Sequence, residues 1–176
     1  MITKYSNKDI LEFLVESNSI ENIYDNLSLA EAHEAWQYAF KHRRKITLEV
    51  ILQIHNLLCG RQFKSKGEKA GRVRNVVVRV GRDIKKFVSV QLIEEELKQW
   101  ILSCKLDKKG VPKHQWEAEI RKWHVAFERI HPFLDGNGRV GRILYNIHRF
   151  NNKLPIHIIH EGDEQELYYE WFNTNA

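Results

Sequence analysis

Hydrophobic residues recur every three or four positions along most of the chain, and this spacing is typical of amphipathic helices that bury one face. On this pattern we predict helices over residues 7–16, 28–42, 47–58, 92–106, 111–130, 140–150 and 165–172. Ser28, with Glu31 three residues later, predicts a capping box for the second helix, and Thr47 predicts the N-cap of the third. We expect Gly60 to end the third helix and residues 61–70 to form a basic loop.

One stretch departs from the helical period. Residues 76–80 consist of valines and one arginine, and β-branched residues favour strands. A turn signal follows at residues 81–83, and residues 87–90 are a candidate return strand. A lone hairpin is marginal in water, so this one needs a surface to pack on. The predicted fold is therefore all-α, a helical bundle with a small β-hairpin, built as one domain over residues 1–176.

Composition and charge narrow the classes of function. The chain has 176 residues and a formal charge of +5, with an isoelectric point near 9.2. Its Lys and Arg residues are interleaved with Asp and Glu, so we expect a modestly basic enzyme rather than a nucleic-acid binder. The chain opens on a polar, charged stretch, and no apolar run approaches membrane-spanning length. We therefore expect a cytoplasmic protein without a membrane partner, and leave open whether it forms a homo-oligomer.

The cysteines and the early histidines suggest no metal site. Cys59 and Cys104 lie in apolar helical contexts without metal or disulfide spacing, so we expect buried free thiols. We interpret His33, His42 and His55 as ordinary surface or half-buried histidines.

The candidate chemistry is concentrated between His131 and Arg142, which read HPFLDGNGRVGR. This segment separates two predicted helices, so it forms a helix–loop–helix turn. Gly136 and Gly138 let the backbone turn tightly and let a ligand approach closely. The second helix is expected to begin at about Asn137, and the free N–H groups at a helix start attract anions.

The charged residues of the segment point to a phosphorylated ligand. Arg139 and Arg142 lie three residues apart and share a helix face, and guanidinium groups hold phosphate oxygens in a fork geometry. Asp135 is a hard oxygen ligand suited to Mg²⁺, and His131 can accept a proton near neutral pH. Taken singly, these residues could be a tight turn and solvated charges. Together, at this spacing, they indicate nucleotidyl or phosphoryl transfer.

The segment resembles the signature of the Fic family, His-x-Phe-x-Asp/Glu-Gly-Asn-Gly-Arg-x-x-Arg, at every defined position. The resemblance implies an all-α fold with a β-hairpin flap, and an enzyme that transfers AMP from ATP to a Tyr, Ser or Thr hydroxyl of a target protein, and to itself. It leaves open the reverse reaction, in which AMP is removed from a protein, and a nucleotide-sensing module without catalysis.

The resemblance also implies a role for each residue of the motif. It makes His131 the base that deprotonates the target hydroxyl, and Asp135 the ligand of Mg²⁺. The residues that it assigns to the ATP phosphates are Gly136, Asn137, Gly138, Arg139 and Arg142. Asn137 steadies either the loop or a phosphate oxygen.

By the same resemblance, residues 71–90 form a flap that covers the nucleotide and docks the target protein by strand addition. The flap residues expected near the nucleotide are Val80, Gly81, Arg82 and Asp83. Tyr168 lines the adenine pocket on this interpretation; the alternative is that Tyr168 and Tyr169 only pack.

Residues 17–22, SNSIEN, resemble the Ser/Thr-x-x-x-Glu-Gly/Asn inhibitory motif of autoinhibited Fic proteins. Taken without the family, they are a polar break between two helices, with Glu21 a surface carboxylate. The resemblance instead places Ser17 and Glu21 in an N-terminal inhibitory region, residues 1–27. It implies that Glu21 reaches Arg142 and takes the place of the γ-phosphate, because a carboxylate and a phosphate compete for one guanidinium.

Overall fold

The computed structural model describes residues 5–78, 87–105 and 112–173. Within these ranges all regular structure is helical, with one short 3₁₀ turn at Val90–Leu92. The α-helices are α1 (Asn7–Ser19), α2 (Asn26–Lys41), α3 (Leu48–Ser65), α4 (Ile93–Ser103), α5 (Lys113–Ile130), α6 (Asn137–Asn151) and α7 (Asp163–Glu170). None of the described helices is both long enough and apolar enough to span a bilayer.

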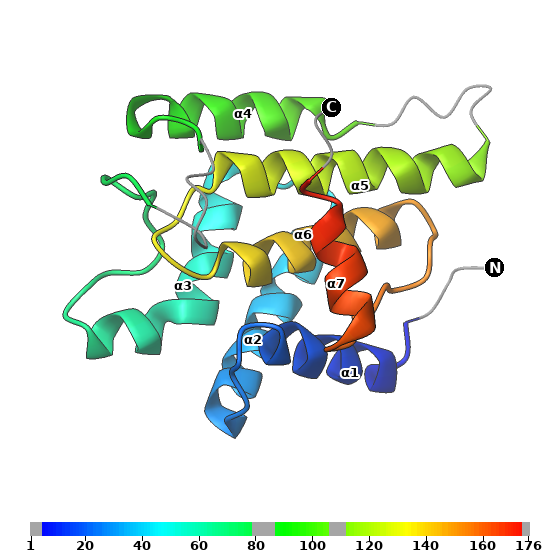
Figure 1. Cartoon of the computed structure of the whole chain (residues 1–176), viewed down its shortest axis with the longest axis horizontal. Coiled ribbons are helices and arrows are strands. Elements are labelled where there is room, and N and C mark those ends of the chain that lie inside the picture. Colours follow the sequence, from blue (N-terminus) through cyan, green and yellow to red (C-terminus); the bar gives the residue numbers. More distant parts are fainter. Residues whose placement is uncertain (1–4, 79–86, 106–111, 174–176) are drawn as a thin grey trace.

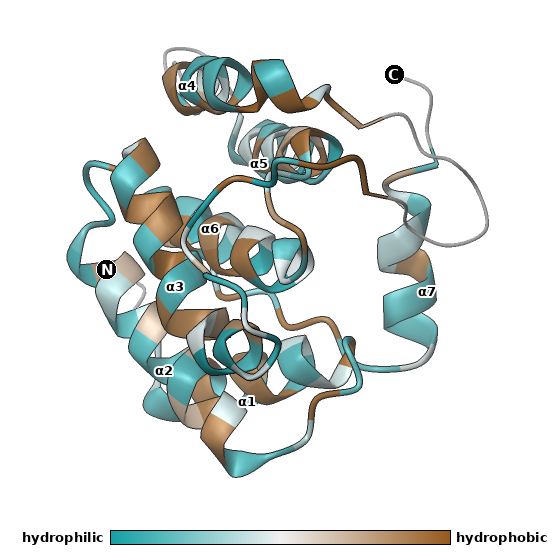
Figure 2. Ribbon diagram, turned by 90° about the vertical axis from the view of Figure 1, so that its left-hand side faces the viewer, coloured by the Kyte–Doolittle hydropathy of each residue, from teal (hydrophilic) through white to brown (hydrophobic). Residues whose placement is uncertain are grey.

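The fold is organised around the hairpin of α5 and α6. Figure 1 shows these two helices running in opposite directions, with α4 on one side of α5, α1 and α2 below α6, and α3 to the left. The short helix α7 crosses in front of α6. Figure 2 views α4 and α5 nearly end-on, and the brown apolar stripes of the helices turn inward. Fully buried core residues include Ile51, Leu97, Phe127, Phe133 and Ile143.

The structure confirms one of the two predicted helix caps and shows that the other is wrong. Thr47 caps α3, and its side chain accepts from the backbone N–H of Val50, which confirms the prediction. The predicted Ser28 cap of α2 is wrong, because α2 begins at Asn26 and is capped by Asp25. The Asp25 carboxylate accepts from the Ser28 backbone N–H at 3.0 Å and from its hydroxyl at 2.6 Å. An ionised acceptor competes better than a hydroxyl for the first free N–H groups.

Helix α3 does not end at Gly60. It continues to Ser65, so the prediction of a loop from residue 61 is wrong for its first five residues. Phe63 is 3% exposed and belongs to the main core, and this burial holds the extra turn in helical form. The extension also carries Gln62 and Lys66 toward the loop between α5 and α6.

The predicted β-hairpin is not observed in the described residues. Residues 76–78 and 87–89 form no strand, and Val80, Gly81, Arg82 and Asp83 lie outside the described residues. Residues 76–78 and 87–89 are held together by Arg74 instead. Its guanidinium donates to the carbonyls of Val76 at 3.0 Å and Val88 at 2.6 Å. The Arg74 side chain thus holds the two segments together without backbone hydrogen bonds between strands. A valine-rich sequence by itself does not ensure that a strand forms.

Buried histidines should make the fold sensitive to acid. Burial lowers the pKa of His55, His131 and His148 to about 4, and that of His124 to about 3. Between about pH 6.5 and pH 4 the unfolded chain therefore binds protons that the native state does not, so stability falls as the pH falls, by at most about 1.4 kcal/mol per pH unit for each histidine. Among the described residues Glu128 and His160 act in the opposite direction, because burial raises the pKa of Glu128 to about 8 and hydrogen bonds to Glu164 and Glu12 raise the pKa of His160.

Urea unfolding between about pH 7 and about pH 5 measures this effect, and we expect the midpoint to drop steadily as the solution is acidified. A midpoint that stayed constant, or rose, over this range would contradict the prediction.

Candidate active site

The loop between α5 and α6 is built by two residues with left-handed backbone. His131 ends α5 with φ 49° and ψ 62°, and Gly136 precedes α6 with φ 81°. A Cβ at position 136 would lie 2.5 Å from the Sγ of Cys59, so only glycine fits between the loop and α3. Helix α6 begins at Asn137, where the sequence predicted it.

The Asn137 side chain steadies this loop. Its Oδ1 accepts from the backbone N–H of Phe133 at 2.8 Å, and its Nδ2 donates to the carbonyl of the same residue at 2.9 Å. Asn137 is 3% exposed. Both ends of the amide are therefore used by the loop, which is the first of the two roles that the sequence left open.

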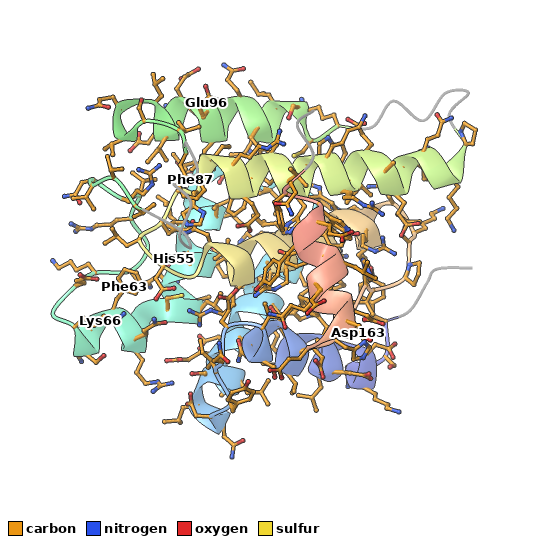
Figure 3. All side chains as sticks on the ribbon, viewed as in Figure 1. His55, Phe63, Lys66, Phe87, Glu96 and Asp163 are labelled. Atoms are coloured by element: carbon orange, nitrogen blue, oxygen red, sulfur yellow. The ribbon has the colours of Figure 1, made fainter. Side chains whose placement is uncertain are left out.

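His131 is a neutral imidazole at the C-terminal end of α5. Burial is the main cause that lowers its pKa to about 4. Its Nδ1 lies 3.3 Å from the Glu128 carbonyl, which can only accept, so Nδ1 carries the proton and Nε2 keeps its lone pair. The ring stacks on Phe87, with centroids 4.1 Å apart, and the His131 carbonyl accepts from Arg74 at 2.7 Å. Figure 3 shows Phe87 beside the end of α5.

Arg142 is buried and is held by the N-terminal helix. Its Nε donates to the Ser17 hydroxyl, and its Nη2 donates to the Ser17 carbonyl, both at 2.9 Å. Nη2 also donates to Glu21 Oε1 at 2.8 Å. Ser17 is in the last turn of α1, so the cation sits at the negative end of that helix. The structure thus brings together the three residues that the inhibitory motif links.

The Glu21 carboxylate also lies against the start of α6. A Cβ at Gly138 would meet Glu21 Oε1 at 2.6 Å and Arg142 Nη1 at 2.8 Å, so the glycine makes room for both. The first N–H groups of a helix lack partners within the helix and attract anions. Ile20, the residue before Glu21, is buried with Ile159 and Tyr168 and so anchors this turn. An internal carboxylate therefore lies at the start of α6, a kind of position that attracts anions.

Arg139 and Asp135 lie on the other side of the loop, where each is bonded to Gln62. Arg139 is 3% exposed, and its Nε is buried without a hydrogen-bond partner in the part of the chain that the structure describes. Asp135 is half-exposed, and its carboxylate accepts from Gln62 and from the Gly136 N–H, each at 2.6 Å. Lys66 lies 3.8 Å from the same carboxylate.

The residues fit a magnesium ion bound together with a phosphorylated ligand. Among the described residues no three metal-binding side chains cluster, so a site supplied wholly by the protein is not formed there. Mg²⁺ commonly uses one or two carboxylates plus substrate phosphates and water. Asp135, half-exposed beside a phosphate-type anion site, suits that mode.

The prediction that His55 is a surface or half-buried histidine is wrong, and its contacts support the motif loop. His55 is fully buried rather than on the surface. Its Nε2 donates to the Asp135 carbonyl at 3.0 Å, its Nδ1 accepts from the Gly71 N–H at 2.8 Å, and its ring stacks on Phe133 at 3.9 Å. The sequence did contain a signal for this burial, because His55 lies in the apolar stripe of α3 with Ile51 and other core residues. It ties the motif loop to α3.

Tyr168 is buried in the protein interior. Its hydroxyl lies 2.9 Å from His124 Nε2, and its ring centroid lies 5.8 Å from the Arg142 Cζ. It packs against Ile20 and Ile159. These contacts show the packing role, and a contact with adenine stays a prediction.

A groove of about 720 Å³ lies between α4, α5 and the end of α7. Val88 and Ile130 line its near end; they are the chain neighbours of Phe87 and His131. Trp100 and Trp171 add aromatic surface. The groove has the size of a small-molecule site.

The fold and the motif geometry together define a Fic-type domain. The family model described as Fic/DOC family matches residues 45–148, more than half of the chain, and the chain belongs to this family. A Fic-domain-containing signaling protein of Bacteroides thetaiotaomicron has a similar solved structure, with a TM-score of 0.75 at 18% identity. The alignment covers 98% of this chain and 76% of that one.

Two curated relatives carry the name of an activity. The chain is 30% identical over 128 residues to protein adenylyltransferase fic-1 of Caenorhabditis elegans, and 25% identical over 171 residues to protein adenylyltransferase Fic of Drosophila grimshawi. These matches cover 73% and 96% of this chain. They cover only 24% and 34% of the relatives, so the chain spans about a quarter to a third of their length.

Proposed function

We propose that this protein transfers AMP from ATP to a hydroxyl group of a target protein. The observation that carries the proposal is a neutral histidine, His131, beside an anion site at the start of α6 that holds two buried arginines, Arg139 and Arg142. The names of the two curated relatives support the same activity.

The ATP phosphates are proposed to bind at the start of α6. Arg139 offers its Nε, which has no partner among the described residues, and Arg142 offers the donors that Glu21 now engages. Gly138 keeps the surface beside Arg142 free of a side chain, so the phosphates can approach the backbone there. Asp135 would hold Mg²⁺, which supplies Lewis-acid charge compensation to phosphate oxygens when bound.

His131 is proposed to act as the general base. Its free Nε2 takes the proton of the target hydroxyl, and the hydroxyl oxygen attacks the α-phosphorus. A bond forms from that oxygen to phosphorus, and the bond from phosphorus to the β-phosphate oxygen breaks. Pyrophosphate leaves, and the buried arginines compensate its charge. The proton remains on His131 and is then released to solvent.

The target protein is proposed to dock along the segment 71–90. Arg74 fixes both legs of this segment to His131, so a chain bound there would present its hydroxyl near the base. The groove beside Val88 offers room for the nucleoside of the donor.

The proposal is tested by incubating the protein with Mg²⁺ and ATP labelled either at the α-phosphate or at the γ-phosphate. AMP transfer puts the α-label on protein and leaves the γ-label in pyrophosphate. Label from the γ-position alone would identify a kinase and overturn the proposal. The same experiment with other nucleoside triphosphates measures the preference for adenine.

A further inference from the structure

The last turn of α3 places Gln62 at the motif. This turn is anchored rather than frayed, because Phe63 is buried in the core and packs edge-on against His55 at 5.2 Å. Figure 3 shows Phe63 and Lys66 along the outer end of α3, with His55 closer to the loop between α5 and α6. Gln62 therefore approaches the motif from a fixed element.

The side-chain amide of Gln62 joins two residues of the motif. Its Nε2 donates to Asp135 Oδ2 at 2.6 Å, and its Oε1 accepts from Arg139 Nη2 at 2.9 Å. A carboxylate can only accept and a guanidinium can only donate, so the two partners determine which way the amide faces. The neutral amide makes one hydrogen bond to each partner and neutralises the charge of neither.

Asp135 and Arg139 carry opposite charges and lie on either side of this amide. Within the described residues, the ion pair of Asp135 is made with Lys66 and not with Arg139. A direct pair would occupy the carboxylate that is available to a cation and the guanidinium that is available to a phosphate. Among the described residues the buried Nε of Arg139 has no hydrogen-bond partner, so the protein does not use all the donors of this guanidinium.

We propose that Gln62 is a positioning residue: it separates and orients Asp135 and Arg139, so that one binds a divalent cation and the other a nucleotide phosphate. The inference rests on the proposed function. It predicts that losing the amide lets Asp135 capture Arg139. ATP binding then weakens even when no divalent cation is present.

The test measures ATP binding by calorimetry in protein that carries Glu21→Gly and His131→Ala, so that the nucleotide can bind without being consumed. Gln62→Met keeps the length of the side chain and removes both hydrogen bonds. We expect it to raise the Kd for ATP about 10-fold in EDTA, and by up to about 100-fold with Mg²⁺, as for other residues that orient the ligands of a metal site.

Two further variants separate positioning from simple structural damage. Gln53→Met makes the same change on the same helix, and the helical repeat of about 3.6 residues places it on the opposite side from Gln62, so we expect unchanged binding. Asp135→Asn removes the charge that would capture Arg139. In that background Gln62→Met should leave ATP binding in EDTA almost unchanged.

The outcomes distinguish a failure of the role of Gln62 from a failure of the proposed function. If Gln62→Met binds ATP as tightly as its parent, or loses the same affinity in the Asp135→Asn background, the positioning role of Gln62 is overturned and the proposed function stands. If the parent protein itself binds no ATP, with or without Mg²⁺, the proposed function fails and the role of Gln62 fails with it. Thermal unfolding of each variant verifies that it is folded.

Discussion

Replacing Glu21 by glycine is expected to raise AMP transfer strongly, including transfer onto the protein itself. The Glu21 carboxylate is bound to Arg142 at 2.8 Å and lies against Gly138 at the start of α6, so it competes with a phosphate for the same donors. A hydrogen bond to a charged group is worth about 1.5–3 kcal/mol, and its loss as a competitor corresponds to an increase of about 10- to 100-fold.

The measurement compares label from α-labelled ATP in wild type and in Glu21→Gly. Asn22→Gly is the matched control, because Asn22 lies in the same turn, with φ 56°, and has no bond to Arg142 among the described contacts. It loosens the backbone without removing the carboxylate. Equal labelling of wild type and Glu21→Gly would argue against inhibition by Glu21. Removal of AMP from a modified target that depends on Glu21 would favour the reverse reaction instead.

Replacing His131 by alanine in the Glu21→Gly protein is expected to abolish transfer while ATP still binds. The imidazole is neutral at physiological pH and keeps Nε2 free, whereas the phosphate-binding groups belong to α6. General-base catalysis contributes about 10²- to 10⁴-fold, so a loss of this size in kcat is expected with little change in the Kd for ATP.

Transfer rates and calorimetric ATP binding, measured on the same preparations, test this separation. His33→Ala is the control, since His33 is exposed on α2, away from the motif. Transfer that persists near the level of the Glu21→Gly parent would rule out His131 as the base. Loss of ATP binding together with transfer would show that the substitution damages the site as a whole.

The candidate chemistry could be read from the sequence because it is local. His131, Asp135 and the two arginines lie within one short segment, and glycine spacing specifies the turn between them. The start of α6 at Asn137 follows from the same local signals. The contact of Glu21 with Arg142 spans 121 positions, and only the family resemblance suggested it before the geometry was seen.

The supporting residues around the motif could not be predicted in the same way. Gln62 reaches the motif only because α3 continues past Gly60, and burial of Phe63 in the core decides that continuation. His55 has the sequence context of a core residue, but its two hydrogen bonds connect segments far apart in the chain. Arg74 replaces a strand ladder in holding the segment 71–78 to its return leg.

The sequence by itself determined the helical bundle and the chemical content of the motif, because helical periodicity and turn residues act over a few positions. Tertiary structure alone decided where α2 and α3 begin or end, how residues 76 and 88 are held together, and which side chain contacts both Asp135 and Arg139. Those outcomes depend on burial and on hydrogen bonds between distant segments. Local propensity is too weak to specify them once packing competes with it.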